Sequence, residues 1–234
     1  MRPTDIMISN YRSIRRLSIP IHPLSVFVGE NGVGKSNLYK SLSLLRDAAA
    51  GRITRTIADE GGLNSVCWSG VRKRGEDGRL RLSVKFDRLK YSIEVGYPAP
   101  LEAAFSGEPM IKSESIETTQ GKRTVLLMER KNSLVSVRSE SGAWRSHRDA
   151  VLPSEPALAG FFDGVLADEI EQSCGYAGFR KILTSSPCTY SFPHTTSPVT
   201  SASPGVLMSL TVPPASRTIS IPAAMSQDCK LRSQ

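Results

Sequence analysis

A glycine-rich octapeptide between an apolar run and an amphipathic run constrains the fold of this chain more than any other feature. Residues 29–36 match G-x-x-x-x-G-K-[ST] at every fixed position. The segment 24–28 before it is apolar and β-branched, which indicates a buried strand, and the segment 35–50 after it has helical periodicity. Its apolar face carries three leucines: Leu38, Leu42 and Leu45. Strand, glycine loop and helix in this order are the setting in which the motif indicates a phosphate-binding loop. A chance glycine turn at a helix start is the lesser alternative.

The chemistry of a nucleoside triphosphate explains the residue types of this loop. Glycines admit backbone conformations and close approaches that a Cβ would block, so that successive N–H groups can surround an anion at the helix N-terminus. Lys35 is expected to reach the β- and γ-phosphates, Ser36 to bind Mg²⁺, and Asn37 to contact the α-phosphate. The predicted nucleotide-binding residues of the loop are Gly29, Glu30, Asn31, Gly32, Val33, Gly34, Lys35, Ser36 and Asn37.

Length and composition predict an ordinary globular chain. The 234 residues suffice for one domain or one and a half, and 39% hydrophobic with 22% charged residues fits a packed core. No apolar run approaches the roughly 20 residues of a membrane helix, and no secretory signal opens the chain. We therefore expect a cytoplasmic protein without a membrane segment. The four cysteines are scattered, which favours isolated reduced thiols over a metal site or disulfides.

The net charge of +8 comes from the first hundred residues, which hold 17 Lys and Arg against 9 Asp and Glu. The remainder is balanced at 13 against 13. Such an excess can form a nucleic-acid surface, but a solvated basic face is the stronger interpretation because charge alone reads no sequence. The basic clusters are Arg12, Arg15 and Arg16, and Arg72, Lys73, Arg74, Arg79 and Arg81.

Alternating apolar and polar residues predict further strands, most of them antiparallel. The expected strands are 5–10, 17–21, 80–86, 89–95, 111–118, 124–130 and 133–138, with a tight turn at 131–132. A helix is expected over 155–174. From residue 184 the chain is rich in Ser, Thr and Pro without sustained periodicity, so we divide it into a domain at 1–183 and a tail at 184–234. Disorder is the leading interpretation of the tail, and a loosely packed extension is the alternative.

These residues resemble the RecF/SMC-like branch of ABC-type ATPases. The turn Asn10-Tyr11-Arg12-Ser13, the loop with its Asn31, Gly32 and Asn37, and the stretch from Glu60 to Gly70 carry the resemblance, which covers roughly residues 5–180. It implies an α/β fold with α+β character: a P-loop NTPase whose N-terminal lobe combines a mixed sheet with an antiparallel β insert. It also implies ATP and Mg²⁺ as ligands, with Tyr11, Arg12 and Ser13 beside the nucleotide. Heads of this type dimerise around two ATP molecules and act on DNA or a partner protein.

Hydrolysis in such heads needs an apolar strand that ends in Asp-Glu. The candidate pair is Asp168 and Glu169, although Phe161, Phe162, Val165 and Leu166 are spaced as on a helix. No signature motif precedes the pair, and His147 and His194 are expected in exposed loops. The resemblance places signature, acidic pair and switch histidine in a later lobe. We therefore expect a truncated or frame-shifted copy whose family sequence ends near residue 183.

The leading function is ATP binding by a RecF/SMC-like AAA ATPase, with ATP hydrolysis only if the head is complete or complemented by a second polypeptide. The alternative is a nucleic-acid-interaction protein in which ATP binding acts as a gate without turnover. A P-loop small-molecule kinase is disfavoured by the antiparallel insert.

Overall fold

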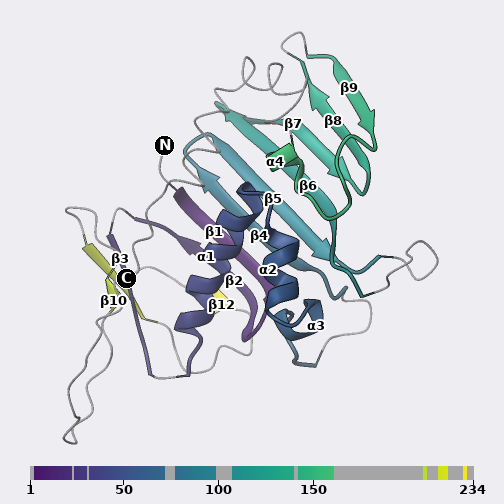
Figure 1. Cartoon of the computed structure of the whole chain (residues 1–234). Coiled ribbons are helices and arrows are strands. Elements are labelled where there is room, and N and C mark those ends of the chain that lie inside the picture. The colour runs from purple at the N-terminus through teal and green to yellow at the C-terminus, as the bar shows by residue number, and fades with distance from the viewer. Residues whose placement is uncertain are drawn as a thin grey trace, which may run out of the picture.

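A computed structural model describes residues 3–22, 24–30, 32–71, 77–98, 107–139 and 142–160, together with three short strands further along the chain. A long sheet crosses the molecule, and helices lie against one of its faces (Figure 1). A second, smaller sheet contains the strand that precedes the glycine loop. This mixed α/β arrangement, with a mainly antiparallel sheet, agrees with the predicted fold class.

The large sheet is antiparallel between all neighbours from β2 to β9. Its order is β12-β2-β1-β4-β5-β6-β7-β8-β9, and only β12 runs parallel to its neighbour β2. The strands are β1 (Pro3–Tyr11), β2 (Ile14–Pro20), β4 (Leu80–Phe86), β5 (Leu89–Gly96), β6 (Met110–Gln120), β7 (Arg123–Lys131), β8 (Leu134–Arg138), β9 (Trp144–Arg148) and β12 (Cys229–Lys230). The strands expected within 5–138 are confirmed. Strand β9 is not predicted by the sequence, and it contains His147, which was expected in a loop.

Two-residue turns connect β4 to β5, β6 to β7 and β7 to β8. Asp87 has a φ of 27°, and Asn132 has a φ of 52°, in the left-handed region that Asn and Asp tolerate better than most residues. The prediction of a turn at 131–132 is wrong by one residue. Lys131 still pairs with Leu134, so the turn consists of residues 132–133.

One face of the large sheet is apolar, as the alternation predicts. Leu82, Val84, Tyr91 and Ile93 are buried on it, on the side where α1 (Lys35–Ala49) packs against β1 and β4 (Figure 1). The opposite face is polar, and we call it the outer face; β4 and β5 contribute Arg81, Lys85, Ser92 and Glu94 to it. None of the helices described in the structure has the length and apolar character that crossing a membrane would require.

Two short helices follow α1, and no helix is predicted there from the sequence pattern. They are α2 (Ile53–Asp59) and α3 (Leu63–Val66), separated by Gly61 and Gly62, whose φ values are 93° and 83°. Their apolar residues Ile53, Ile57, Leu63 and Val66 are all buried. The glycines therefore mark the break between two helices that pack on the core. Cys67, directly after α3, is buried, and its thiol donates to the Gly78 carbonyl at 3.4 Å.

Strand β3 (Leu24–Val28) is not part of the large sheet. It lies between β10 (Met208–Ser209), which is antiparallel to it, and β11 (Ser216–Ser220), which is parallel. The structure thus places β3 in a small mixed sheet of its own, apart from β1 and β2. Phe27 of β3 is buried and meets the ring of Tyr39 on α1 edge to face at 6.5 Å, so β3 packs on the helix. These short strands lie inside 184–234, and a domain boundary near residue 183 stays a prediction.

A buried ion pair fixes the segment that follows the insert. Glu114 accepts hydrogen bonds from the Tyr91 hydroxyl at 2.9 Å and from the backbone N–H groups of Ala157 and Leu158 at 2.6 and 2.9 Å. Arg130 lies 3.9 Å from Glu114 and donates to the carbonyls of Leu152, Glu155 and Asn132. Burial raises the pKa of Glu114 and lowers that of Arg130. Glu114 thereby caps α4 (Ala157–Gly160). The remainder of the helix expected over 155–174 lies outside the described residues.

Candidate nucleotide-binding site

The glycine loop lies between β3 and α1, where the sequence predicts it. Gly32 and Gly34 have φ values of 90° and 102°, a region that strains any residue with a Cβ. Gly34 is the N-cap of α1, and Lys35 is its first residue. The motif thus places its two internal glycines where the backbone requires them. Asn31 lies outside the described residues.

The N-terminus of α1 is open to an anion. Among the described residues no side chain caps it, and its first turn carries no acidic residue. The N–H groups of Asn37 and Leu38 bond to the Gly34 carbonyl at 3.0 and 3.1 Å. Because a helix N-terminus carries partial positive charge and unpaired N–H groups, this end of a 15-residue helix favours a bound anion.

Lys35 is buried and points back over the loop. The residue is only 8% exposed, and its Nζ donates to the carbonyls of Gly29 and Glu30 at 2.5 and 2.6 Å. Carbonyl oxygens stabilise an ammonium group but do not neutralise it. Its charge is therefore available to a phosphate bound in the loop. Val33 is partly buried and Ser36 is exposed at the start of the helix.

The turn between β1 and β2 touches the first turn of α1. The Asn37 side-chain amide donates to Ser13 Oγ at 2.8 Å. Asn10 and Arg12 have φ values of 62° and 47°, which non-glycine residues rarely adopt. The last residue of α3 holds this turn, because the Arg12 N–H donates to the Val66 carbonyl at 2.7 Å. Such strained positions concentrate at ligand sites.

An ion pair and a buried phenol complete the turn. Arg12 Nη2 lies 2.7 Å from Glu60 Oε2, with both side chains about a quarter exposed. The hydrogen bond to Glu60 raises the pKa of Arg12. Tyr11 is fully buried, and this burial, together with the charge of Glu60, raises its pKa to about 12.

Three buried polar atoms in this turn have no hydrogen-bond partner of normal geometry among the described residues. They are Asn10 Nδ2, the Tyr11 hydroxyl and Arg12 Nε. Most buried polar groups in folded proteins are hydrogen-bonded, so three such atoms in consecutive residues mark a place where a ligand can supply partners. Asn10 and Glu60 are not among the predicted site residues. Asn10 belongs to the Asn-Tyr-Arg-Ser turn, whereas Glu60 is 48 positions from Arg12 and has no local signal.

The structure gives no position to the predicted hydrolytic pair, since Asp168 and Glu169 lie outside the described residues. Strand β11 runs parallel to β3, and the carboxyl ends of parallel strands meet at one edge of a sheet. In the sequence, Ile221 and Pro222 follow β11, and neither has a carboxylate. Across the described parts of the chain, no group of three or more His, Cys, Asp or Glu side chains could hold a metal ion.

Known proteins resemble this chain over the part that contains the loop. The sequence model of a family described as "AAA ATPase domain" matches residues 1–145. The chain belongs to the AAA ATPase domain family. It is also 32% identical over 94 residues to the DNA replication and repair protein RecF of Mesorhizobium japonicum. These findings confirm the predicted RecF-like AAA ATPase character.

The alignment with that RecF protein covers 40% of this chain and 22% of the relative. The matched part of this chain thus corresponds to less than a quarter of the relative's length. Family membership implies nucleotide use and, as a rule, Mg²⁺.

Proposed function

We propose that this chain binds Mg-ATP in the loop between β3 and α1. The observation that carries the proposal is the buried Lys35 ammonium, held over the loop by two carbonyls beside a helix N-terminus without a cap or an acidic residue. The buried Asn10 Nδ2 and Arg12 Nε of the neighbouring turn, which have no hydrogen-bond partner among the described residues, support it from a second element. Membership of an ATPase family supports the choice of nucleotide.

The chain's own residues have separate tasks in this proposal. The backbone N–H groups from Gly29 to Ser36 surround the phosphates, and Lys35 exchanges its carbonyl partners for phosphate oxygens. Ser36, exposed at the first turn of α1, supplies a hydroxyl ligand to Mg²⁺, which screens the phosphate charge. Asn37 holds Ser13 at the edge of the site, and Arg12 faces the nucleotide from the turn.

The proposal is ATP binding with little or no hydrolysis by the isolated chain. Support comes from the lack of a carboxylate at the residues that directly follow β11. Hydrolysis would then depend on Asp168 and Glu169 or on a second polypeptide, and a dimer of two heads around ATP is the arrangement that we propose for activity.

The test is nucleotide binding by the Lys35→Ala variant. Titration with a fluorescent ATP analogue in Mg²⁺ should show an affinity loss of about tenfold to a hundredfold, because a charged hydrogen-bonded partner is removed. Circular dichroism should show an unchanged fold. Lys40→Ala is the matched control, since Lys40 is exposed on the same helix. Equal affinities of Lys35→Ala and the unaltered chain would refute the site.

Phosphate release, measured on the same samples, tests the second half of the proposal. The unaltered chain should release phosphate no faster than Lys35→Ala. Rapid turnover that Lys35→Ala abolishes would contradict binding without hydrolysis and would direct attention to Asp168 and Glu169.

A second candidate is a nucleic-acid-interaction protein gated by ATP. The basic excess of residues 1–100 favours it, as does the similarity to RecF, which is named as a DNA replication and repair protein. Salt-dependent DNA binding that Mg-ATP alters in the unaltered chain but not in Lys35→Ala, without phosphate release, would favour this candidate over a nucleotide-driven machine.

A further inference from the structure

Strand β9 is the last strand of the large sheet, and no described strand pairs with its far side. It lies at the end of the sheet away from α1 (Figure 1). It has five residues, Trp144–Arg148, and four of them are exposed. An edge strand of this kind presents a row of backbone N–H and C=O groups with which another extended chain can pair.

The hydrogen bonds at both ends of β9 show which of its backbone groups face the open edge. The Asp149 N–H donates to the Ser133 carbonyl at 3.0 Å, and the Ser139 N–H donates to the Ala143 carbonyl at 2.8 Å. Bonded and non-bonded pairs alternate along an antiparallel ladder, so the odd-numbered residues of 143–149 bond to β8. The even-numbered residues of β9 therefore direct their N–H and C=O groups away from β8, to the open edge.

The same three residues, Trp144, Ser146 and Arg148, place their side chains on the outer face of the sheet. Ser146 lies opposite Ser136, in a cross-strand row that reaches Ser92 of the outer face. Trp144 and Arg148 are two positions from Ser146 and share its face. Beside its open backbone groups, β9 thus offers an indole that is 47% exposed, a small hydroxyl side chain and a cation.

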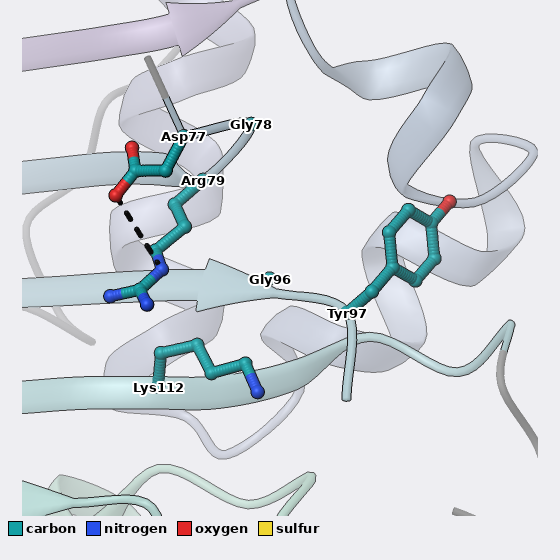
Figure 2. Close-up of a pocket in the computed structure, with 6 residues that line it drawn as sticks. All are labelled: Asp77, Gly78, Arg79, Gly96, Tyr97 and Lys112. Atoms are coloured by element: carbon teal, nitrogen blue, oxygen red, sulfur yellow. Dashed lines mark ion pairs between the residues drawn. The ribbon is translucent and has the colours of Figure 1, made fainter. Parts of the chain in front are cut away.

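The charge of Arg148 is not neutralised within the part of the chain that the structure describes. Arg148 is exposed, and no described carboxylate lies within ion-pair distance of it. The start of β4 differs, because Arg79 lies 3.6 Å from Asp77, the pair drawn in Figure 2, and 3.2 Å from Glu94. Strand β9 itself contains no Asp or Glu. Its charge therefore favours a partner that brings a carboxylate.

We propose that β9 is a docking edge for an extended segment of a partner protein. The segment pairs antiparallel with β9 and places a carboxylate opposite Arg148 and an apolar side chain opposite Trp144. Pairing with a second copy of this chain is disfavoured, because two β9 strands would bring four arginines and no carboxylate into one short ladder. The glycine loop takes no part in this contact, so docking does not require ATP.

The experiment titrates a fluorescein-labelled peptide, acetyl-Ser-Glu-Thr-Thr-Thr-Val-Ser-amide, with the full chain and follows its anisotropy. In the antiparallel register its Glu lies opposite Arg148 and its Val opposite Trp144. We expect saturable binding. Ser146→Pro removes one N–H at the open edge and no bond to β8, a position at which edge strands tolerate proline, and should weaken binding about tenfold. Ser146→Ala keeps the N–H and should bind as the unaltered chain does.

Charge exchange at Arg148 tests the recognition of the carboxylate. Arg148→Glu should weaken binding of the Glu peptide about fivefold and should strengthen binding of the same peptide with Lys in place of Glu by a similar factor. Trp144→Ala should weaken binding of both peptides. Arg88→Glu is the matched control, because Arg88 is exposed in the turn between β4 and β5, and it should change affinity less than about twofold.

Thermal melts establish that each variant folds, and if Ser146→Pro unfolds the chain, the charge exchange at Arg148 decides alone. Three outcomes overturn the proposal: no saturable binding of the Glu peptide, equal binding by folded Ser146→Pro and Ser146→Ala, or equal losses in Arg148→Glu and Arg88→Glu. Sedimentation of the chain without peptide identifies the other occupant. A dimer that Ser146→Pro dissociates would overturn the proposal in favour of pairing between two copies.

Discussion

The ion-pair partner of Arg12 determines how readily the Arg12 guanidinium can bind a phosphate in the proposed ATP site. Its guanidinium is bound by Glu60, so a phosphate must compete with that carboxylate. We predict that Arg12→Gln weakens Mg-ATP binding about tenfold, whereas Glu60→Gln strengthens it, because the second change frees the cation and removes a negative charge. Fluorescent ATP titrations measure both. Unfolding free energies should change by less than about 1 kcal/mol, since the pair is partly exposed.

A comparable pair at the other end of α1 supplies the control. Arg52 lies 3.3 Å from Asp47, and Arg52→Gln breaks this pair without touching the loop. It should leave ATP affinity unchanged. Weaker binding in both Arg12→Gln and Glu60→Gln would contradict the competition argument and would make Glu60 a residue that positions Arg12.

Tyr11 makes stability depend on pH in the alkaline range. Its pKa is raised from 10.0 to about 12, first by burial and then by Glu60, so the fold favours the protonated phenol. The stabilisation is fully present below pH 10 and is lost as pH rises towards 12, because the unfolded chain releases the proton first. A shift of this size corresponds to roughly 2–3 kcal/mol. Urea unfolding at pH 9, 10 and 11 should show a steeper decline for the unaltered chain than for Tyr11→Phe, and parallel curves would contradict the assignment.

At the scale of elements, the alternation of apolar and polar residues was sufficient to predict a strand wherever one face of that strand is buried. Strands β4 and β5 carry Leu82, Val84, Tyr91 and Ile93 at alternate positions, and both were predicted nearly to their ends. Strand β9 has no such signal, because all its residues except His147 are exposed and its place is set by pairing with β8. The pairing of β3 with β10 and β11 joins residues about 190 positions apart, which no local pattern encodes.

The residues of the candidate site likewise include some that local sequence predicts and others that it does not. Gly34 and Lys35 could be predicted because the motif is continuous and its φ and charge requirements are local. Glu60 could not be predicted, because it is 48 positions from Arg12 and meets it only in the folded chain. The Gly61-Gly62 pair concealed α2 and α3, since a glycine pair is as typical of a loop as of a break between helices.

The Glu114–Arg130 pair joins the insert to α4 and is predicted to dominate the stability of that junction. Glu114→Ala leaves Arg130 buried without its countercharge and removes the cap of α4, which should cost about 3–5 kcal/mol. Glu117→Ala is the matched control on the same strand, because its 3.4 Å pair with Lys90 is partly exposed and is worth less than about 1 kcal/mol. Urea unfolding compares the two variants, and similar losses would show that burial of the pair is irrelevant.

At the scale of the whole molecule, the proposed ATP site depends on distant parts of the chain. Strand β3 leads into the loop, and its two neighbours, β10 and β11, both lie after residue 207. Composition alone favours a disordered tail over 184–234, in which case the tail would be dispensable for binding. The pairing of β3 favours the opposite, because backbone N–H and C=O groups of a buried strand need partners.

Truncation after residue 207 distinguishes these two expectations. We predict that the chain 1–207 melts at a lower temperature and binds Mg-ATP more weakly than the full chain, because β3 loses the hydrogen bonds to β10 and β11. Truncation after residue 221 is the control. It removes β12 but keeps both neighbours of β3, and β2 keeps its long pairing with β1, so ATP affinity should be retained. Equal affinity and melting temperature for 1–207 and 1–234 would show instead that β3 is held by α1 alone, through the contact of Phe27 with Tyr39.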